Sequence, residues 1–160
     1  MTRKTRNDLL ELLVLSNVLI RNGGSVSLHM ERANKPVLEK SAAVIVDYAK
    51  KLGICNWVYG DIDECPVLLQ TVSKYLDAKL YFPQEGLYVP ASHQRSKENN
   101  IVFVRTCIGD ADIAEIVNFR KDAGKEVTKA AVVALFDFRE KLRNPEISVR
   151  SVYNGEDLLF

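Results

Sequence analysis

The spacing of apolar and polar residues predicts helices alternating with strands. Between Leu9 and Ile20 the chain is apolar on more than one side, which predicts a largely buried helix from Asn7 or Asp8 to about Arg21. The segment 22–24, Asn-Gly-Gly, is expected to stop this helix. Residues 25–31, SVSLHME, alternate apolar with polar side chains and predict a half-buried strand.

The middle of the chain continues in the same manner. Apolar residues at helical spacing predict a second helix from Pro36 to about Gly53, and a third helix ending near Leu76. Between these helices, residues 54–60 predict a strand. Residues 78–91 predict a hairpin turning at 84–86, and residues 92–100 predict a polar loop.

The last third contains the strongest strand pattern, IVFVRTCI at residues 101–108. We expect two more helices, one from about Asp112 with Glu115 in capping-box register and one from Thr128 to about Arg143. A final strand is expected over residues 147–153. Together these elements predict one α/β (α+β) domain over residues 1–160, in which about five helices pack on a mixed or antiparallel sheet. Residues 1–7 would form a short basic arm.

Composition fits a globular protein without a strong electrostatic bias. Of 160 residues, 47% are hydrophobic and 27% charged, and 22 basic against 21 acidic side chains leave a formal charge of +1. Binding to a polyanion would therefore need a local basic patch. Asp8 and Glu11 interrupt the N-terminal apolar run, and no stretch reaches the roughly 18 apolar residues of a membrane span. We expect a cytoplasmic protein that makes no contact with a membrane.

The cysteines give no sign of a metal or disulfide site. Cys55, Cys65 and Cys107 are odd in number and widely separated, without the short ligand pairs typical of zinc. Buried free thiols in a reducing compartment are the expected state. No metal ion or cofactor is predicted.

A resemblance to a known family rests on the first third of the chain. The spacing of Leu15, Leu19, the Gly23-Gly24 pair, Val26, Leu28 and Glu31, followed by a helix over residues 37–53, resembles the N-terminal domain of WhiA-type sporulation regulators. That domain is related in fold to the LAGLIDADG homing endonucleases, and the resemblance covers residues 8–54. The nucleases place an acidic metal ligand just before the final glycine, and in this chain Asn22, Gly23 and Gly24 occupy that region without a carboxylate. The resemblance therefore implies a DNA-binding scaffold without nuclease chemistry, contacted through Ser25, Ser27, His29 and Glu31.

Basic residues near the N-terminus and between 120 and 143 are the candidate nucleic-acid contacts. The second region holds seven basic residues, Arg139 among them, and four acidic ones. Interleaved charges of this kind are also typical of a solvated helix face. Our first hypothesis is a non-enzymatic regulatory module that binds DNA or RNA, or acts beside a nucleic-acid machine. The residues expected to contact phosphate are Arg3, Lys4, Arg6, Arg120, Lys121, Lys125 and Lys129.

Two alternatives remain open. One is a protein-interaction or inhibitor module that binds a partner, or a second copy of itself, through the helix between Leu9 and Ile20. The other is a small metal-dependent hydrolase, in which Asp61, Asp63 and Glu64 act with His93. The competing interpretation of these acids is that they cap the helix that follows them. No nucleotide-binding P-loop, GxSxG or HExxH motif occurs.

Overall fold

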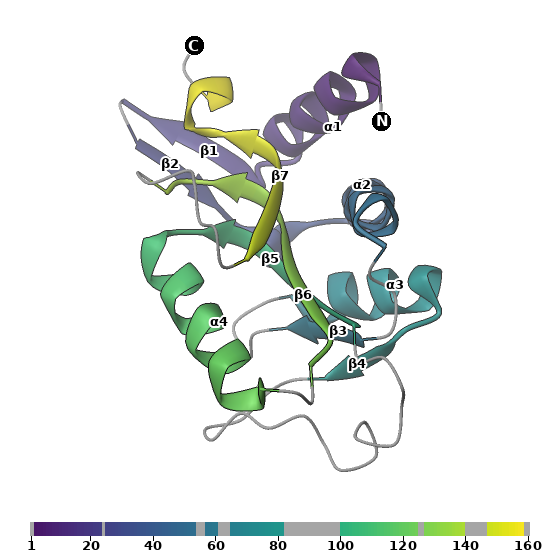
Figure 1. Cartoon of the computed structure of the whole chain (residues 1–160). Helices are drawn as coiled ribbons and strands as arrows, with labels where there is room; N and C mark the ends of the chain where they lie inside the picture. The colour runs from purple at the N-terminus through teal and green to yellow at the C-terminus, as the bar shows by residue number, and fades with distance from the viewer. Residues whose placement is uncertain are drawn as a thin grey trace.

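The protein is described by a computed structural model in which a five-stranded parallel sheet is flanked by helices (Figure 1). The structure describes residues 2–23, 25–53, 57–60, 65–81, 100–124, 127–139 and 147–158. The strand order is β4 (Lys79–Tyr81), β3 (Trp57–Gly60), β5 (Asn100–Ile108), β6 (Lys129–Asp137) and β7 (Ser148–Asn154). The α/β class is confirmed. The expected mixed or antiparallel sheet is wrong, because every pairing among these strands is parallel.

Four α-helices are present in the described part of the chain. They are α1 (Arg3–Leu15), α2 (Lys35–Lys51), α3 (Pro66–Leu76) and α4 (Asp110–Ala123). Two short 3-10 turns are η1 (Met30–Arg32) and η3 (Gly155–Leu158). Among the described residues, no helix is long and apolar enough to cross a membrane.

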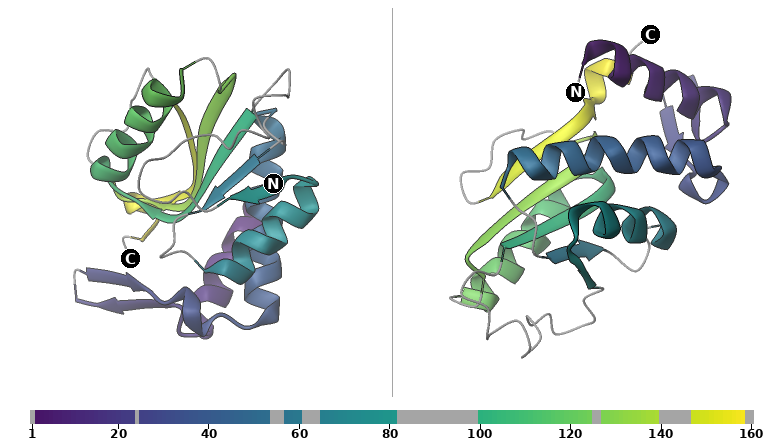
Figure 2. Two further views of the ribbon diagram at one scale, coloured as in Figure 1. Left: turned by 90° about the horizontal axis from the view of Figure 1, so that it is seen from below. Right: turned by 90° about the vertical axis from the view of Figure 1, so that its right-hand side faces the viewer.

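The chain changes its winding direction between β3 and β5. From β3 it passes through α3 to β4 on one side, and from β5 through α4 to β6 on the other. Right-handed crossovers then place α3 and α4 on opposite faces of the sheet, as Figure 2 shows. At such a reversal the carboxyl ends of neighbouring strands border a crevice, which is where ligands bind in open α/β sheets.

Each face of the sheet has its own apolar core. On one face, helices α1, α2 and α3 bury residues such as Leu13, Ile45 and Leu69 against Val102 and Val133. On the other face, α4 covers the sheet, and the rings of Tyr59, Phe103 and Phe119 meet edge to face with centroids 5.3–5.4 Å apart. Burial of this apolar surface is the main force that holds the layers together.

The N-terminal segment differs from the expected long helix. Helix α1 ends at Leu15, and Asn17 then adopts a left-handed φ of 56°. The chain continues into the antiparallel ribbon of β1 (Leu19–Asn22) and β2 (Ser25–Leu28), with Leu19 opposite Leu28. Gly23, with φ of 61°, therefore lies in a hairpin turn and does not stop a helix. The strand expected at 25–31 is confirmed over 25–28.

The basic residues expected to form an arm belong to α1. Its N-cap is Thr2, whose hydroxyl accepts a hydrogen bond from the backbone N–H of Thr5 at 3.2 Å. Residues 3–7 thus form the first turns of a capped helix.

The helix expected from Thr128 to about Arg143 is wrong over its first ten residues, because Lys129–Asp137 is strand β6. From Ala130 to Asp137 every residue is buried, and β5 and β7 pair with it on both sides. A strand covered on both faces needs a continuous apolar run rather than an alternating one. Pairing on two sides outweighs the helix propensity of its three alanines.

Other boundaries are close to those expected. Helices α2 and α3 and strands β3, β5 and β7 are confirmed. Helix α4 begins at Asp110, and Asp112 rather than Glu115 bonds back to the N-cap residue, accepting from the Gly109 N–H at 2.7 Å. Strand β4 pairs in parallel with β3. The rest of the predicted hairpin and the polar loop, residues 82–99, lie outside the described residues.

Candidate functional site at the carboxyl edge of the sheet

The strands β5, β6 and β7 end at the same level in the sheet. Ile108, the last residue of β5, is opposite Asp137 on β6, which in turn is opposite Asn154 on β7. Gly60, at the end of β3, is opposite Val104. We call this side of the sheet the carboxyl edge; it comprises Gly60, residues 105–109, residues 137–139 and Asn154.

A buried ion pair lies at the centre of this edge. The Asp137 Oδ1 atom accepts hydrogen bonds from the backbone N–H and the Nε of Arg139, at 3.0 and 2.9 Å, and Oδ2 accepts from Nη2 at 2.7 Å. The side chains are 3% and 4% exposed. Both carboxylate oxygens are therefore occupied, while Arg139 Nη1 is buried without a hydrogen-bond partner among the described residues.

Phe138 lies between the two charged residues and is 43% exposed. Its backbone N–H donates to the carbonyl oxygen of Ile108 at 3.0 Å, which joins the ends of β5 and β6. Its ring is nearly parallel to that of Phe136, with an interplanar angle of 7° and centroids 6.2 Å apart. Phe136 in turn packs on Tyr153 at 5.1 Å. The carboxyl edge thus carries a supported aromatic ring that is open to solvent.

A second buried cation lies on β5. Arg105 is 7% exposed; its Nη1 donates to the carbonyl oxygen of Val104 at 3.3 Å, and its Nε has no hydrogen-bond partner among the described residues. The guanidinium lies 5.9 Å from the centre of the Phe103 ring. A buried guanidinium is costly unless an acceptor or an anion satisfies it. Arg105 therefore places a buried positive charge on β5, three residues before the strand ends.

The nearby N-terminus of α4 already has its own acceptor. Asp110 and Asp112 occupy the first turn, and the carboxylate of Asp112 bonds to the backbone of Gly109. These charges complement the helix dipole. An anion would consequently depend on Arg105 rather than on the amides of this helix.

Arg6 connects the N-terminal helix to the C-terminal turn. Its Nη2 lies 2.5 Å from Asp157 Oδ1, its guanidinium lies over the Tyr153 ring at 5.6 Å, and its carbonyl oxygen accepts from the Tyr153 hydroxyl. Burial raises the pKa of Tyr153 well above its ordinary value. These contacts indicate a structural role for Arg6.

The predicted nucleic-acid contacts do not form one surface. Arg3 and Lys4 are exposed on α1, whereas Arg120 and Lys121 lie in the last turn of α4, at the opposite end of the molecule (Figures 1 and 2). Lys129 donates to the carbonyl oxygen of Leu52 at 2.6 Å, at the end of α2. Lys125 lies outside the described residues.

The hydrolase candidates, Asp61, Asp63, Glu64 and His93, also lie outside the described residues. Within the described part of the chain, no group of three histidine, cysteine, aspartate or glutamate residues could hold a metal ion. Cys65 and Cys107 are half-buried, and Cys55 is not described.

Three polar side chains at and just beyond the end of β2 form a hydrogen-bonded chain. His29 Nε2 is 3.2 Å from Ser27 Oγ, and His29 Nδ1 is 3.1 Å from Glu31 Oε1. A hydrogen bond from its own backbone, aided by His29, holds the pKa of Glu31 below its ordinary value. These side chains satisfy one another on the surface of the ribbon.

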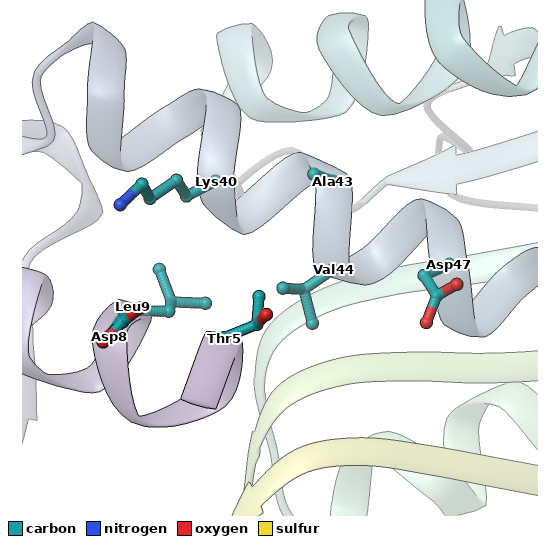
Figure 3. A pocket seen from close by; sticks show the side chains of 7 residues that line it. All are labelled: Thr5, Asp8, Leu9, Lys40, Ala43, Val44 and Asp47. Carbon is teal, nitrogen blue, oxygen red and sulfur yellow. The ribbon is translucent and has the colours of Figure 1, made fainter. Parts of the chain in front are cut away.

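A pocket of about 250 Å³ lies between α1 and α2. Figure 3 shows Thr5, Asp8 and Leu9 of α1 facing residues of α2 across it. Lys40, Ala43, Val44 and Asp47 complete its lining. Val14 and Leu15 are exposed near the end of α1, and the expected association through this helix stays a prediction.

Comparison with known proteins identifies the fold. No protein-family model and no curated protein sequence matches the chain. Among solved structures, orotate phosphoribosyltransferase of Francisella tularensis has a TM-score of 0.64 at 17% identity, covering 94% of this chain and 87% of that one. Adenine phosphoribosyltransferase of Trypanosoma brucei, in complex with AMP, pyrophosphate and ribose-5-phosphate, has a TM-score of 0.65 at 12% identity, covering 100% and 84%.

The chain has the phosphoribosyltransferase fold. Leishmania donovani UMP synthase is also similar, with a TM-score of 0.69 at 15% identity; the match covers 98% of this chain but spans only 37% of that protein. The expected kinship with WhiA-type regulators and LAGLIDADG nucleases is therefore wrong. The helix, glycine pair and alternating strand that suggested it form α1 and the β1–β2 ribbon of a different fold.

The phosphoribosyltransferase fold also corrects the predicted function. The structural neighbours are enzymes, whereas the sequence favoured a non-enzymatic nucleic-acid module. Arg105, Asp137 and Phe138 of the carboxyl edge were not among the predicted site residues, and from the sequence Arg139 is only one of several basic residues. One signal was present: Arg105 is the charged residue in the strand predicted over 101–108, and a charge in a buried strand needs a reason.

Proposed function

We propose that this chain acts in nucleotide metabolism as a phosphoribosyltransferase, which moves a ribose 5-phosphate unit between pyrophosphate and a nitrogen base. The observation that carries the proposal is the similarity in fold, over nearly the whole chain, to transferases for both orotate and adenine. A shared fold does not identify which base this chain would use. The reaction class is what these neighbours have in common.

The carboxyl edge is the proposed binding site. Ligands of open α/β sheets bind beyond the carboxyl ends of the strands where the winding direction reverses, here between β3 and β5. The Trypanosoma brucei neighbour holds phosphate-bearing ligands. Arg105, three residues before the end of β5, would supply a permanent positive charge for such a ligand.

In the proposed enzyme, Asp137 has a structural role. Because Arg139 occupies both of its oxygens, Asp137 is not available as a general base. The ion pair instead fixes the backbone around Phe138. Arg105 contributes by attracting the phosphate groups and by stabilising negative charge on departing pyrophosphate.

The test is an assay of the reverse reaction with the purified chain. AMP, GMP, UMP and orotidine 5′-monophosphate are each incubated with pyrophosphate and Mg²⁺, and free base is measured by chromatography. We expect base release from at least one nucleotide, with a loss of about 10-fold or more in Arg105→Met, since a charged hydrogen bond contributes about 1.5–3 kcal/mol. Lys121→Met, at the far end of α4, should retain full activity.

A fold control accompanies these variants. Circular dichroism and urea titration of Arg105→Met and Arg105→Lys show whether each remains folded. Absence of base release from all four nucleotides, together with absence of binding of ribose 5-phosphate and pyrophosphate by calorimetry, would contradict the proposal.

A further inference from the structure

We infer that the pocket between α1 and α2 binds a free α-amino acid with an apolar side chain. The charged head of this ligand would lie between Asp8 and Lys40, and its side chain would cover the apolar floor of the pocket. None of the residues that line the pocket belongs to the carboxyl edge, so the inference does not depend on the proposed function.

Short side chains on the two helices leave this pocket open. The lining residues lie three and four positions apart on each helix, so they form one face of α1 and one face of α2. Near the middle of these faces are Thr5 and Ala43, whose side chains are too short to fill the space between the helices (Figure 3). The resulting volume of about 250 Å³ is smaller than the roughly 300–1000 Å³ of pockets for drug-sized ligands. It suits a molecule of amino-acid size rather than a nucleotide.

The floor of the pocket is apolar. Leu9 and Val44 point into the space between the helices in Figure 3, and both belong to the core cluster beneath α1 and α2. Ala43 beside them is exposed. The hydroxyl of Thr5 is already hydrogen-bonded to the hydroxyl of Thr2, at 2.9 Å. This part of the pocket therefore presents apolar surface to a ligand, and covering that surface favours binding.

One end of the pocket carries a charge of each sign. Asp8 and Lys40 lie at this end in Figure 3, and neither forms an ion pair with another residue in the described part of the chain. At the other end, Asp47 is paired with Lys51 at 3.2 Å. Of the charged side chains that line the pocket, Asp8 and Lys40 are therefore the ones left for a ligand.

Two neighbouring charges of opposite sign select a zwitterion. An ammonium group would pair with Asp8, and a carboxylate would pair with Lys40. A simple alkylamine would place its cation near Lys40, and a fatty acid would place its anion near Asp8, so each would meet repulsion. An α-amino acid avoids both, because one carbon carries the ammonium group, the carboxylate and the apolar side chain. Exposed ion pairs contribute little free energy each, so we expect binding in the millimolar range.

The experiment measures binding to the purified chain by calorimetry, with leucine as the first ligand. Three analogues each lack one feature: isoamylamine lacks the carboxylate, isocaproate lacks the ammonium group, and glycine lacks the apolar side chain. We expect saturable binding of leucine. Isoamylamine and isocaproate should each bind about 2- to 5-fold more weakly than leucine. Glycine should bind about 10-fold more weakly or worse.

Variants of the chain locate the site. Asp8→Asn and Lys40→Met should each weaken leucine binding about 2- to 5-fold. Glu11→Gln and Lys50→Met are the matched controls, because they remove exposed charges of the same sign from the same helices outside the pocket. Ala43→Leu fills the pocket with the side chain of a good helix former. It should abolish leucine binding without lowering the melting temperature of the ligand-free chain.

A second measurement does not depend on the heat of binding. Leucine should raise the melting temperature of the parent chain with increasing concentration, and should shift the amide NMR signals of Thr5, Leu9 and Val44. The inference is wrong if none of leucine, valine and phenylalanine binds saturably, or if isoamylamine or isocaproate binds as tightly as leucine. Leucine binding that Ala43→Leu leaves unchanged would also overturn it.

The outcome is separate from that of the proposed function. Base release in the reverse assay should be unaffected by Ala43→Leu, because the substitution lies outside the carboxyl edge. Failure of leucine to bind would therefore leave the proposed transferase reaction standing.

Discussion

Arg139 holds Asp137 through both carboxylate oxygens, although only Phe138 separates them in the chain. The pair closes a tight loop at the end of β6, and both side chains are buried. A carboxylate at the end of a parallel strand is often a ligand or a base. Here it fixes the backbone that presents an aromatic ring at the carboxyl edge.

Breaking this ion pair should destabilise the protein strongly. Asp137→Asn leaves the guanidinium of Arg139 buried without a counter-charge, and removal of one partner of a buried pair costs about 3–5 kcal/mol. The free energy of unfolding, measured by urea titration, should fall by that amount. The double variant Asp137→Leu with Arg139→Met should lose much less, because it leaves no buried charge.

The exposed pair of Lys35 and Glu39, 3.8 Å apart, provides the control. Glu39→Gln should change the free energy of unfolding by less than about 1 kcal/mol. Equal losses in Asp137→Asn and Glu39→Gln would show that the Asp137–Arg139 pair does not have the role assigned to it.

Lys129 should stabilise the end of α2. Its ammonium group donates to the carbonyl oxygen of Leu52, which has no partner inside the helix, and its charge opposes the helix dipole. Lys129→Met should lower the free energy of unfolding by about 0.3–1 kcal/mol, and less in high salt. Lys4→Met, in the first turn of α1, should cause no loss. A loss for Lys4→Met equal to that for Lys129→Met would point to a general effect of charge.

Gly53 should resist substitution because of its backbone. It follows α2 with φ of 70°, and an added Cβ would meet only Lys129 Nζ, at 3.9 Å. The cost of Gly53→Ala is therefore conformational, about 1–2 kcal/mol by thermal or urea unfolding. Gly155→Ala, where neither a left-handed φ nor a close contact opposes the methyl group, should be nearly neutral. Similar losses at both glycines would refute this explanation.

Tyr153 should make stability fall at alkaline pH. Burial raises the pKa of its phenol in the folded state above the ordinary value of about 10, so folding favours the protonated form. The resulting stabilisation is complete below about pH 10 and is lost as the pH rises above it, because the unfolded chain ionises first. Between about pH 9 and 11, the free energy of unfolding should decline with rising pH less steeply in Tyr153→Phe than in the parent chain.

The same substitution has a second effect at neutral pH. Tyr153→Phe removes the hydroxyl that donates to the Arg6 carbonyl oxygen, at a cost of about 1 kcal/mol. Tyr75→Phe, on the exposed surface of α3, should leave the alkaline slope as it is in the parent chain. A slope unaltered by Tyr153→Phe would contradict the assignment.

Local pattern predicted most elements, and the misassigned segments have a physical explanation. Residues 101–108 are β-branched or aromatic at most positions and form β5, whereas 130–136 contain three alanines and only two β-branched residues. A short apolar run of this kind fits a buried strand or a buried helix equally well. Pairing with β5 and β7, between residues up to 29 positions apart, decides the outcome and leaves no local signal.

The candidate site was less predictable because its parts come together only in the sheet. Arg105 and Phe138 are 33 residues apart in the sequence, and each alone resembles an ordinary charged or apolar residue. The parallel register that places Ile108 opposite Asp137 brings the ends of their two strands side by side. The basic residues that do stand out in the sequence are spread over α1, α4 and the end of α2.

The most direct test of the account is to map where ribose 5-phosphate binds on the isotopically labelled chain by amide NMR. The account predicts saturable shifts concentrated at the carboxyl edge, at Arg105, Ile108 and Phe138, and smaller or absent shifts in Arg105→Met. Shifts confined to the pocket between α1 and α2, or none at millimolar ligand, would contradict it.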